Sequence, residues 1–315
     1  MRSFLGLDTS NYTTSCAVYI PSRGELFQSK RLLPVKEGEL GLRQSDAVFH
    51  HTKQLPELFE ALMDMLPECS IDVITASVAP RCCEGSYMPC FLVGEGYARV
   101  LAGANKCTLY RTSHQTGHVL AALYSADKME LLHKEKPFLA FHVSGGTTDL
   151  LLCTPDKESV IKIEHLASSL DLKAGQAIDR VGLMLGLKFP CGKELEKLAE
   201  KADKRIPCRI TFKDGNCCLS GVENICRKHF ENGETRENVA MLCLDLVLKA
   251  IKGMTEYALG LHPGSEIVYA GGVMSDKILQ TELAKSFDAY FATADFSCDN
   301  AAGVALYGAI KEGLI

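Results

Sequence analysis

The sequence lacks several features that would place it in a common class. No apolar run reaches the length of a membrane span, and the first eight residues, which end at Asp8, lack the long apolar core of a signal peptide. We therefore expect a cytoplasmic protein with no membrane association. The formal net charge of −5 argues against a large non-specific nucleic-acid surface, but a local basic patch, or a partner that supplies one, is compatible with it.

Several catalytic and metal-binding motifs are also missing. The 14 cysteines include no C-x-x-C pair, which excludes zinc-ribbon and thioredoxin sites, so we expect reduced thiols. There is no H-E-x-x-H motif and no Ser-His-Asp order, so nothing supports a protease. There is no P-loop lysine, and Gly94-Glu95-Gly96 is not a dinucleotide fingerprint because it lies inside a helical pattern without a third glycine.

The pattern that is present alternates strands with helices, which predicts an α/β protein. A length of 315 residues allows two domains or one large one. Two segments, 4–20 and 138–153, share one plan of an apolar strand, a small polar turn and a second apolar strand. This repetition predicts two similarly built lobes with a nucleotide cleft between them.

The chain is organised around the stretch from Ser113 to His118. Two histidines four residues apart on a helix project from the same face, so His114 and His118 can reach one metal ion. The preceding segment, 107–111, has the composition of a short buried strand. The pair would then lie at the carboxyl end of a strand, where open α/β sheets bind ligands. A surface or packing coincidence is the alternative interpretation of such a pair.

Other stretches allow a functional and a structural interpretation. The turn Ser144-Gly145-Gly146 lets a phosphate or a ring approach the backbone. The pair Gly271-Gly272 lies between a strand and a helix, so this pair either contacts a nucleotide or serves packing. Asp299 has two interpretations: it caps the start of the last helix, or its carboxylate is the third ligand of the metal ion. His50 and His51 lie on the helix that ends near Leu66, and we interpret them as solvated or packing residues.

In their order along the chain, these motifs resemble the tRNA adenosine threonylcarbamoyltransferases, the TsaD/Gcp family long mislabelled as sialoglycoprotein endopeptidases. The resemblance covers nearly the whole chain, and the ordered combination of H-x-x-x-H, Ser-Gly-Gly and Asp-Asn-Ala-Ala is specific. The segments that carry it are 6–10, the strand ending at Pro80, 113–118, 144–148, 174–179, 189–192, 219–221, 270–273 and 299–302.

The resemblance implies the two-lobed actin/hexokinase/Hsp70-like (ASKHA) fold. The lobes would be 1–111 and 112–315, with the last helix, 299–315, packing back on the N-terminal lobe. It also implies one divalent metal ion, iron or zinc, held by His114, His118 and Asp299. Two imidazoles and one carboxylate leave open positions at which a carbonyl group can be polarised.

The resemblance further implies that threonylcarbamoyl-adenylate, an ATP/AMP-type nucleotide, binds in the cleft. The pocket would be lined by His142, Val143, Ser144, Gly145 and Gly146, with Asp179 and Gly192 on the other lobe. Its remaining contacts would come from Gly271, Gly272 and Asp276. Because the adenylate is a good leaving group, no covalent nucleophile is needed, and no cysteine has the context of one.

The implied reaction transfers the threonylcarbamoyl group to the adenosine next to the anticodon of tRNA. Bacterial members of the family work with a smaller paralogue of the same fold and a P-loop ATPase, so we expect tRNA and such proteins as partners; a homodimer is another expected assembly.

The chain departs from the family pattern where phosphate or acceptor would bind. Asn11, Tyr12 and Thr13 replace Cys-Asp-Glu, so Ser10, Asn11, Tyr12 and Arg81 become the candidate phosphate contacts. Arg81-Cys82-Cys83-Glu84-Gly85 replaces a Gly-Pro-Gly-rich stretch, Thr147 replaces a histidine, and Asp276 replaces an asparagine. These changes favour a divergent paralogue. Two alternatives to tRNA modification therefore stay open, namely carbamoylation of another acceptor and a non-catalytic nucleotide-binding scaffold.

Overall fold

The computed structural model describes residues 2–10, 12–34, 42–297 and 301–315. The chain forms two compact units. The first comprises 1–133, 155–162 and 298–315, and the second comprises 134–154 and 163–297. None of the described helices is long and apolar enough to cross a membrane.

The first unit is built on a five-stranded sheet of order β3-β2-β1-β4-β5. Its strands β1, β2 and β3 are antiparallel, whereas β4 and β5 run parallel to β1. The elements are β1 (Phe4–Ser10), β2 (Thr13–Ile20), β3 (Glu25–Leu32), α1 (Gln44–Asp64), β4 (Val73–Ala79), α2 (Phe91–Asn105), β5 (Thr108–Ser113), α3 (His114–Ser125), η1 (Met129–His133) and α9 (Ala302–Lys311).

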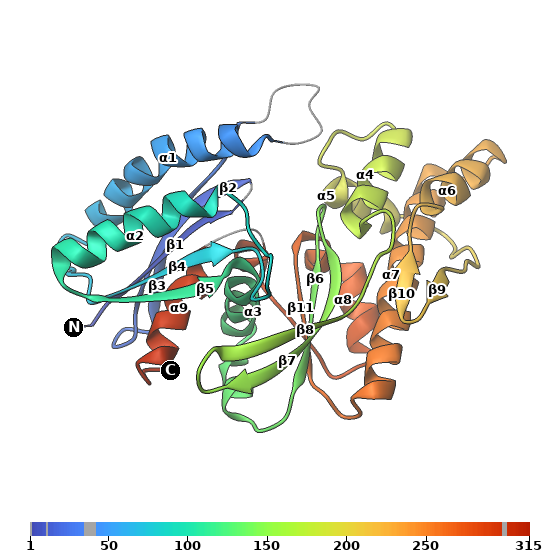
Figure 1. Cartoon of the computed structure of the whole chain (residues 1–315). Helices are drawn as coiled ribbons and strands as arrows, with labels where there is room; N and C mark the ends of the chain where they lie inside the picture. The colour runs from blue at the N-terminus through green and yellow to red at the C-terminus, as the bar shows by residue number, and fades with distance from the viewer. Residues whose placement is uncertain (1, 11, 35–41, 298–300) are drawn as a thin grey trace. The chain divides into compact units, whose positions relative to one another are not determined.

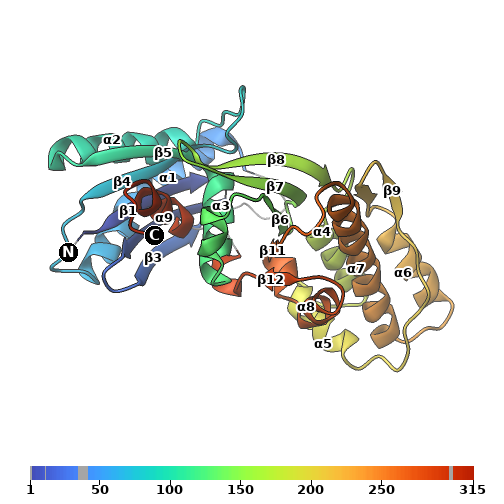
Figure 2. The ribbon, with the colours of Figure 1, turned by 90° about the horizontal axis from the view of Figure 1, so that it is seen from below.

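Helices cover both faces of this sheet (Figures 1 and 2), which explains why β1 and β2 are buried along their whole length. Helices α1 and α2 pack on one face through Leu5, Leu7 and Leu55. On the other face, α9 packs against Phe4 and Val73 through its alanines and Leu306. The last helix thus belongs to the first unit.

The second unit contains most of a five-stranded sheet of order β12-β11-β6-β7-β8, in which β11 and β12 run parallel to β6 and β7 is antiparallel to it. The residues around the turn between β7 and β8, 155–162, are counted with the first unit. The elements are β6 (Phe138–Val143), β7 (Thr148–Asp156), β8 (Val160–Ser168), α4 (Ala174–Met184), α5 (Gly192–Ala199), β9 (Thr211–Lys213), β10 (Asn216–Cys218), α6 (Val222–Glu231), α7 (Arg236–Leu261), β11 (Ile267–Ala270), η2 (Gly272–Ser275), α8 (Lys277–Ala284), β12 (Ala289–Phe291) and η3 (Ala294–Phe296).

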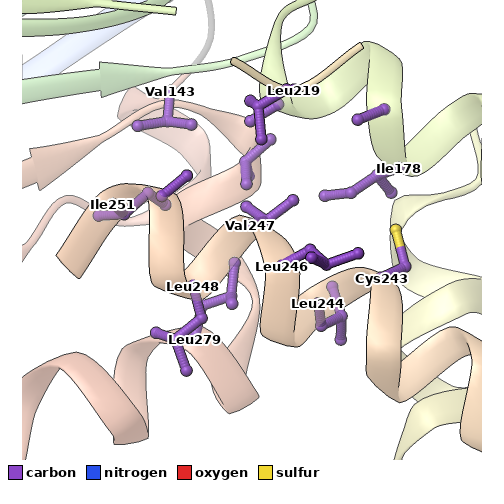
Figure 3. Close-up of a cluster of buried hydrophobic side chains, with 14 of the residues drawn as sticks. Val143, Ile178, Leu219, Cys243, Leu244, Leu246, Val247, Leu248, Ile251 and Leu279 are labelled. Carbon is purple, nitrogen blue, oxygen red and sulfur yellow. The ribbon is translucent and has the colours of Figure 1, made fainter. Parts of the chain in front are cut away.

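Helix α7 is the centre of the second unit's core. Val247 and Ile251 are fully buried, and Figure 3 shows them among Val143 of β6, Ile178 of α4 and Leu279 of α8. A helix that is apolar over most of its circumference must be surrounded by other elements, and α7 meets that condition.

The two expected hairpins are confirmed as β1–β2 and β6–β7. The first unit extends to His133, whereas the sequence placed the boundary between the lobes at residues 111/112. Helix α3 stays with the first unit because it packs closely against α9, and a connecting segment up to His133 follows it there.

Candidate metal centre and nucleotide pocket

The histidine pair lies where the sequence predicts it. Strand β5 ends at Ser113, whose side-chain oxygen accepts a hydrogen bond from the Thr116 amide at 3.1 Å and so caps α3. His114 and His118 follow on the first turns of α3, and their Nε2 atoms are 2.9 Å apart. The two rings therefore share one helix face at the carboxyl end of β5, but the segment 107–111, which was expected to be buried, is half-buried or exposed because β5 is the edge strand of its sheet.

A buried carboxylate that the sequence reasoning passed over holds one of these rings. Asp8, near the end of β1, is 1 % exposed, and its Oδ2 lies 2.7 Å from Nδ1 of His114. Its Oδ1 accepts a hydrogen bond from the hydroxyl of Ser77 on β4 at 2.8 Å. The available signal was an acid at the end of an apolar strand, a position that in parallel sheets faces the ligand edge.

The arrangement of the two rings fits two ligands of one metal ion. Nitrogen ligands about 2.1 Å from one ion lie roughly 3.0–3.4 Å from each other, close to the observed separation of 2.9 Å. Imidazole that ligates a metal commonly donates its other N–H to a carboxylate, as the contact with Asp8 allows. Among the described residues no group of three or more His, Cys, Asp or Glu side chains forms a metal site.

The predicted third ligand, Asp299, lies outside the described residues, as does Asn11. The helix that follows Asp299 nevertheless contacts the helix of the histidine pair. A Cβ atom on Gly303 of α9 would lie only 1.8 Å from the carbonyl oxygen of Gly117, between the two histidines. Only glycine permits this approach of α9 to α3.

The candidate phosphate contacts of the first unit sit around the same strand ends. Ser10 is 3 % exposed and its hydroxyl has no hydrogen-bond partner among the described residues, whereas Tyr12 is 40 % exposed. Arg81 follows Pro80, whose carbonyl accepts a hydrogen bond from the Gln115 amide of α3 at 3.0 Å. The loop after β4 therefore lies against the first turn of α3.

In the second unit, the predicted glycine-rich turns pack directly on each other. Gly271 has a φ of +100°, and a Cβ there would lie 2.2 Å from the carbonyl oxygen of Val143. The Gly175 amide at the start of α4 donates to the Ser144 carbonyl at 3.1 Å. The ends of β6 and β11 and the start of α4 are thereby brought together.

The Ser144 turn is closed by its own side chain. Its hydroxyl oxygen accepts hydrogen bonds from the amides of Gly146 at 3.2 Å and Thr147 at 3.1 Å. These two N–H groups are therefore used within the turn, and a phosphate would have to displace the serine hydroxyl to reach them.

A cavity of about 690 Å³ opens beside these turns, within the second unit. Its lining includes five of the predicted nucleotide contacts: Gly145, Asp179, Gly192, Gly272 and Asp276. The expectation that Asp179 and Gly192 belong to the other lobe is wrong. Helix α4 starts directly behind the Ser144 turn, and the Cys191 amide donates to Asp179 Oδ1 at 2.8 Å, so all five belong to one unit.

The other predicted contacts are not part of that lining. Val143 is fully buried beneath Gly271, and Ser144 organises its turn. His142 pairs with Ala270 and Asp149 across the sheet. The sequence reasoning missed Lys193, Glu194 and Glu196, which also line the cavity, because they read as an ordinary exposed helix start.

The cavity is acidic, and burial shifts its carboxyl groups. Burial raises the pKa of Asp276 to about 6, an effect reinforced by the nearby Glu196 and opposed by the Leu279 amide, which donates to Asp276 at 3.0 Å. Burial also raises the pKa of Asp179, against the opposing hydrogen bond from Cys191. Acceptor groups of this kind suit hydroxyl and amine donors such as those of a nucleoside.

His51 is the buried member of the adjacent histidine pair. It is fully buried, its Nδ1 lies 2.8 Å from the Thr14 hydroxyl, and burial lowers its pKa to about 4. The interpretation as a packing residue, and not a ligand, agrees with this position.

The model of the TsaD family, described as tRNA N6-adenosine threonylcarbamoyltransferase, matches residues 36–306. The chain belongs to the TsaD family. The match includes the histidine pair, both glycine-rich turns of the second unit and the segment that leads into the last helix.

Solved structures show the fold of this TsaD-family chain. Full-length HypF in a phosphate- and nucleotide-bound form is similar with a TM-score of 0.58 at 12 % identity, over 99 % of this chain and 55 % of HypF. Component A of the Acidaminococcus fermentans (R)-2-hydroxyglutaryl-CoA dehydratase gives 0.56 at 14 % identity, over 99 % and 100 %. EutJ from Carboxydothermus hydrogenoformans gives 0.52 at 11 % identity, over 98 % and 90 %. The fold is the ASKHA fold.

Proposed function

We propose that this chain transfers a threonylcarbamoyl group from threonylcarbamoyl-adenylate to the adenosine next to the anticodon of tRNA. The observation that carries the proposal is the TsaD family match together with the 2.9 Å separation of the His114 and His118 nitrogens. We propose iron or zinc as the metal, with Asp299 as its third protein ligand. The close packing of α9 on α3 at Gly303 supports that choice, because Asp299 stands only three residues before Ala302, the first residue of α9, in the chain.

In this proposal the reaction needs no covalent intermediate on the protein. The N6 amine of the adenosine attacks the carbamoyl carbon, the bond from that carbon to the phosphate oxygen breaks, AMP leaves, and the amine loses a proton. A metal bound at the histidine pair would polarise the carbonyl oxygen. The described cysteines are free thiols, and burial raises the pKa of Cys191, which contacts the cavity residue Asp179, so it is a poor nucleophile.

The residues of the second unit would hold the nucleotide. The acidic groups Asp179 and Asp276 can accept hydrogen bonds from the ribose hydroxyls or from the adenine amine. The small residues Gly145, Gly192 and Gly272 leave room for the base and sugar, and 690 Å³ is within the range of small-molecule sites.

The identity of Asp276 favours one alternative, namely transfer to an acceptor other than tRNA. Asp276 stands where the family has asparagine, and a carboxylate cannot donate the hydrogen bond that an amide can. The cavity therefore selects ligand groups differently from a typical member, which is compatible with carbamoylation of another acceptor.

Complementation tests the proposal most simply. The full chain, with its partner proteins supplied, is expressed in a strain that lacks the usual transferase, and the modified adenosine is measured in its tRNA. We expect the wild type to restore the modification and His114→Ala to abolish it, while the exposed His133→Ala has no effect. Failure of the wild type, expressed and folded alongside its partners, would reject tRNA as the acceptor.

A further inference from the structure

Three neighbouring strands of the first unit end in one continuous chain of polar contacts. Asp8 lies near the end of β1, Ser77 lies near the end of β4, and His114 immediately follows β5. These strands are parallel neighbours, so their carboxyl ends meet at one edge of the sheet. Ser77 and Asp8 are buried to 0 % and 1 % exposure, respectively.

The hydrogen-bond partners fix the direction of this chain. A carboxylate only accepts, so the Ser77 hydroxyl donates to Asp8 Oδ1 at 2.8 Å, and His114 must place its proton on Nδ1 to donate to Oδ2 at 2.7 Å. In the neutral ring, the Nε2 of His114 then carries a lone pair, and this atom is the one that lies 2.9 Å from Nε2 of His118. The tautomer that the contact with Asp8 selects is therefore the tautomer that a metal ligand needs.

We propose that Asp8 is the positioning residue of the metal centre, and that Ser77 holds Asp8 in the required orientation. This inference rests on the proposed metal site, and it extends that site to a second layer of residues. Asp8 does not contact the metal or the donor in this account, because both of its oxygens point to protein partners. Its role is to set the ring orientation, the tautomer and the basicity of His114.

The position of the carboxylate supports this role over a purely structural one. A buried carboxylate is costly to desolvate, and Asp8 receives hydrogen bonds from one serine and one histidine side chain. A structural need at the end of β1 would be met at lower cost by an uncharged residue. A carboxylate increases the electron density of the imidazole that it contacts, which a neutral amide cannot do to the same extent.

The test uses the whole chain and two readouts other than transfer activity. In the metal-free protein, long-range proton–nitrogen NMR of the imidazole rings reports the tautomer of His114. Zinc affinity is measured separately by competition with a chromophoric chelator. Asp8→Asn keeps the shape of the side chain, and Asp64→Asn, on the exposed end of α1, is the matched control.

We expect the wild-type His114 to be in the Nδ1–H form, and Asp8→Asn to lose that preference. We expect zinc affinity to fall by about 10–100-fold in Asp8→Asn and to stay unchanged in Asp64→Asn. Ser77→Ala removes only one hydroxyl and should weaken zinc binding by about 3–10-fold, so it serves if Asp8→Asn fails to fold.

The outcomes separate this inference from the proposed function. A wild type that binds zinc without transferring the group to tRNA contradicts only the proposed reaction. Unchanged tautomer and zinc affinity in Asp8→Asn and Ser77→Ala would overturn the role of Asp8 and leave the reaction standing. A wild type that binds neither zinc nor iron overturns both.

Discussion

The two units share one sheet plan but carry different chemistry at the ends of their strands. In each unit an antiparallel meander of three strands is extended by two parallel strands, giving the orders β3-β2-β1-β4-β5 and β8-β7-β6-β11-β12. In the first unit, the parallel strands end in Asp8, Ser77 and His114, which contact one another. In the second unit, β6 and β11 lead into glycine-rich turns beside a cavity.

In both units the carboxyl ends of the parallel strands form an edge at which a ligand can bind, and the residues that follow each strand determine which ligand fits there. Side chains with nitrogen and oxygen donors make the first edge suitable for a cation. Backbone packing at Gly271 and Gly175 brings the glycine-rich turns of the second edge together beside a cavity whose carboxylates can accept hydrogen bonds.

The largest expected effect is on metal content. Replacing His114 or His118 by alanine should reduce bound zinc or iron from about one ion per chain to less than about a tenth, because the remaining ligands cannot hold the ion alone. Elemental analysis of purified protein measures this. The control His165→Ala removes a histidine of the second unit and should leave the metal content unchanged; equal loss there would show that metal binding is not specific to the first unit.

The next effect is on the stability of the second unit. Gly271→Ala should lower the free energy of unfolding by about 2–4 kcal/mol, because it strains a positive φ and places a methyl group against the Val143 carbonyl. Urea unfolding followed by fluorescence or circular dichroism measures this. Gly272→Ala is the neighbouring control, since a Cβ added there would meet none of the described atoms beyond its chain neighbours within 4 Å, and it should change stability by less than about 0.5 kcal/mol. Equal effects in the two variants would contradict the packing account.

An effect of similar size concerns the pH dependence set by Asp276. Its folded-state pKa, raised to about 6 by burial, exceeds the ordinary carboxyl value of 3.8, so the folded state binds the proton more tightly. The contribution of Asp276 to wild-type stability should therefore fall as pH rises from about 4 to about 6, and its penalty is complete above that range.

Asp276→Asn removes this penalty and retains a side chain that caps α8 well. The variant should be more stable than the wild type by about 3 kcal/mol at pH 7, with little difference below pH 4. Thermal or urea unfolding across this pH range measures the difference. A gap that is independent of pH would show that the ionisation of Asp276 is not its cause.

Much of this architecture follows from the sequence pattern. The hairpins β1–β2 and β6–β7 were predictable because each joins apolar strands through a small polar turn. The helix of the histidine pair was also expected, and the structure adds that Ser113 caps it. The helix that carries His50 and His51 was expected to end near Leu66, and α1 ends at Asp64 with Met65 as its C-cap.

Long-range contacts explain what the sequence could not show. Asp8 and His114 are far apart in the chain, and only the parallel pairing of β1, β4 and β5 brings them within hydrogen-bond distance. The expected lobe 112–315 already contains both Ser144 and Asp179, and the structure adds the contact of α4 with the Ser144 turn that local patterns do not show. The predicted role of Asp299 remains a proposal.

The measurement that tests the central claim most directly is the X-ray absorption spectrum of the metal-loaded full chain. The sequence contains 14 cysteines, so sulfur ligands are a real alternative to imidazole. The account predicts two imidazole nitrogens and further oxygen or nitrogen ligands at about 2.0–2.2 Å, with the imidazole signal lost in His114→Ala. Sulfur scatterers at about 2.3 Å, or a spectrum that His114→Ala leaves unchanged, would contradict it.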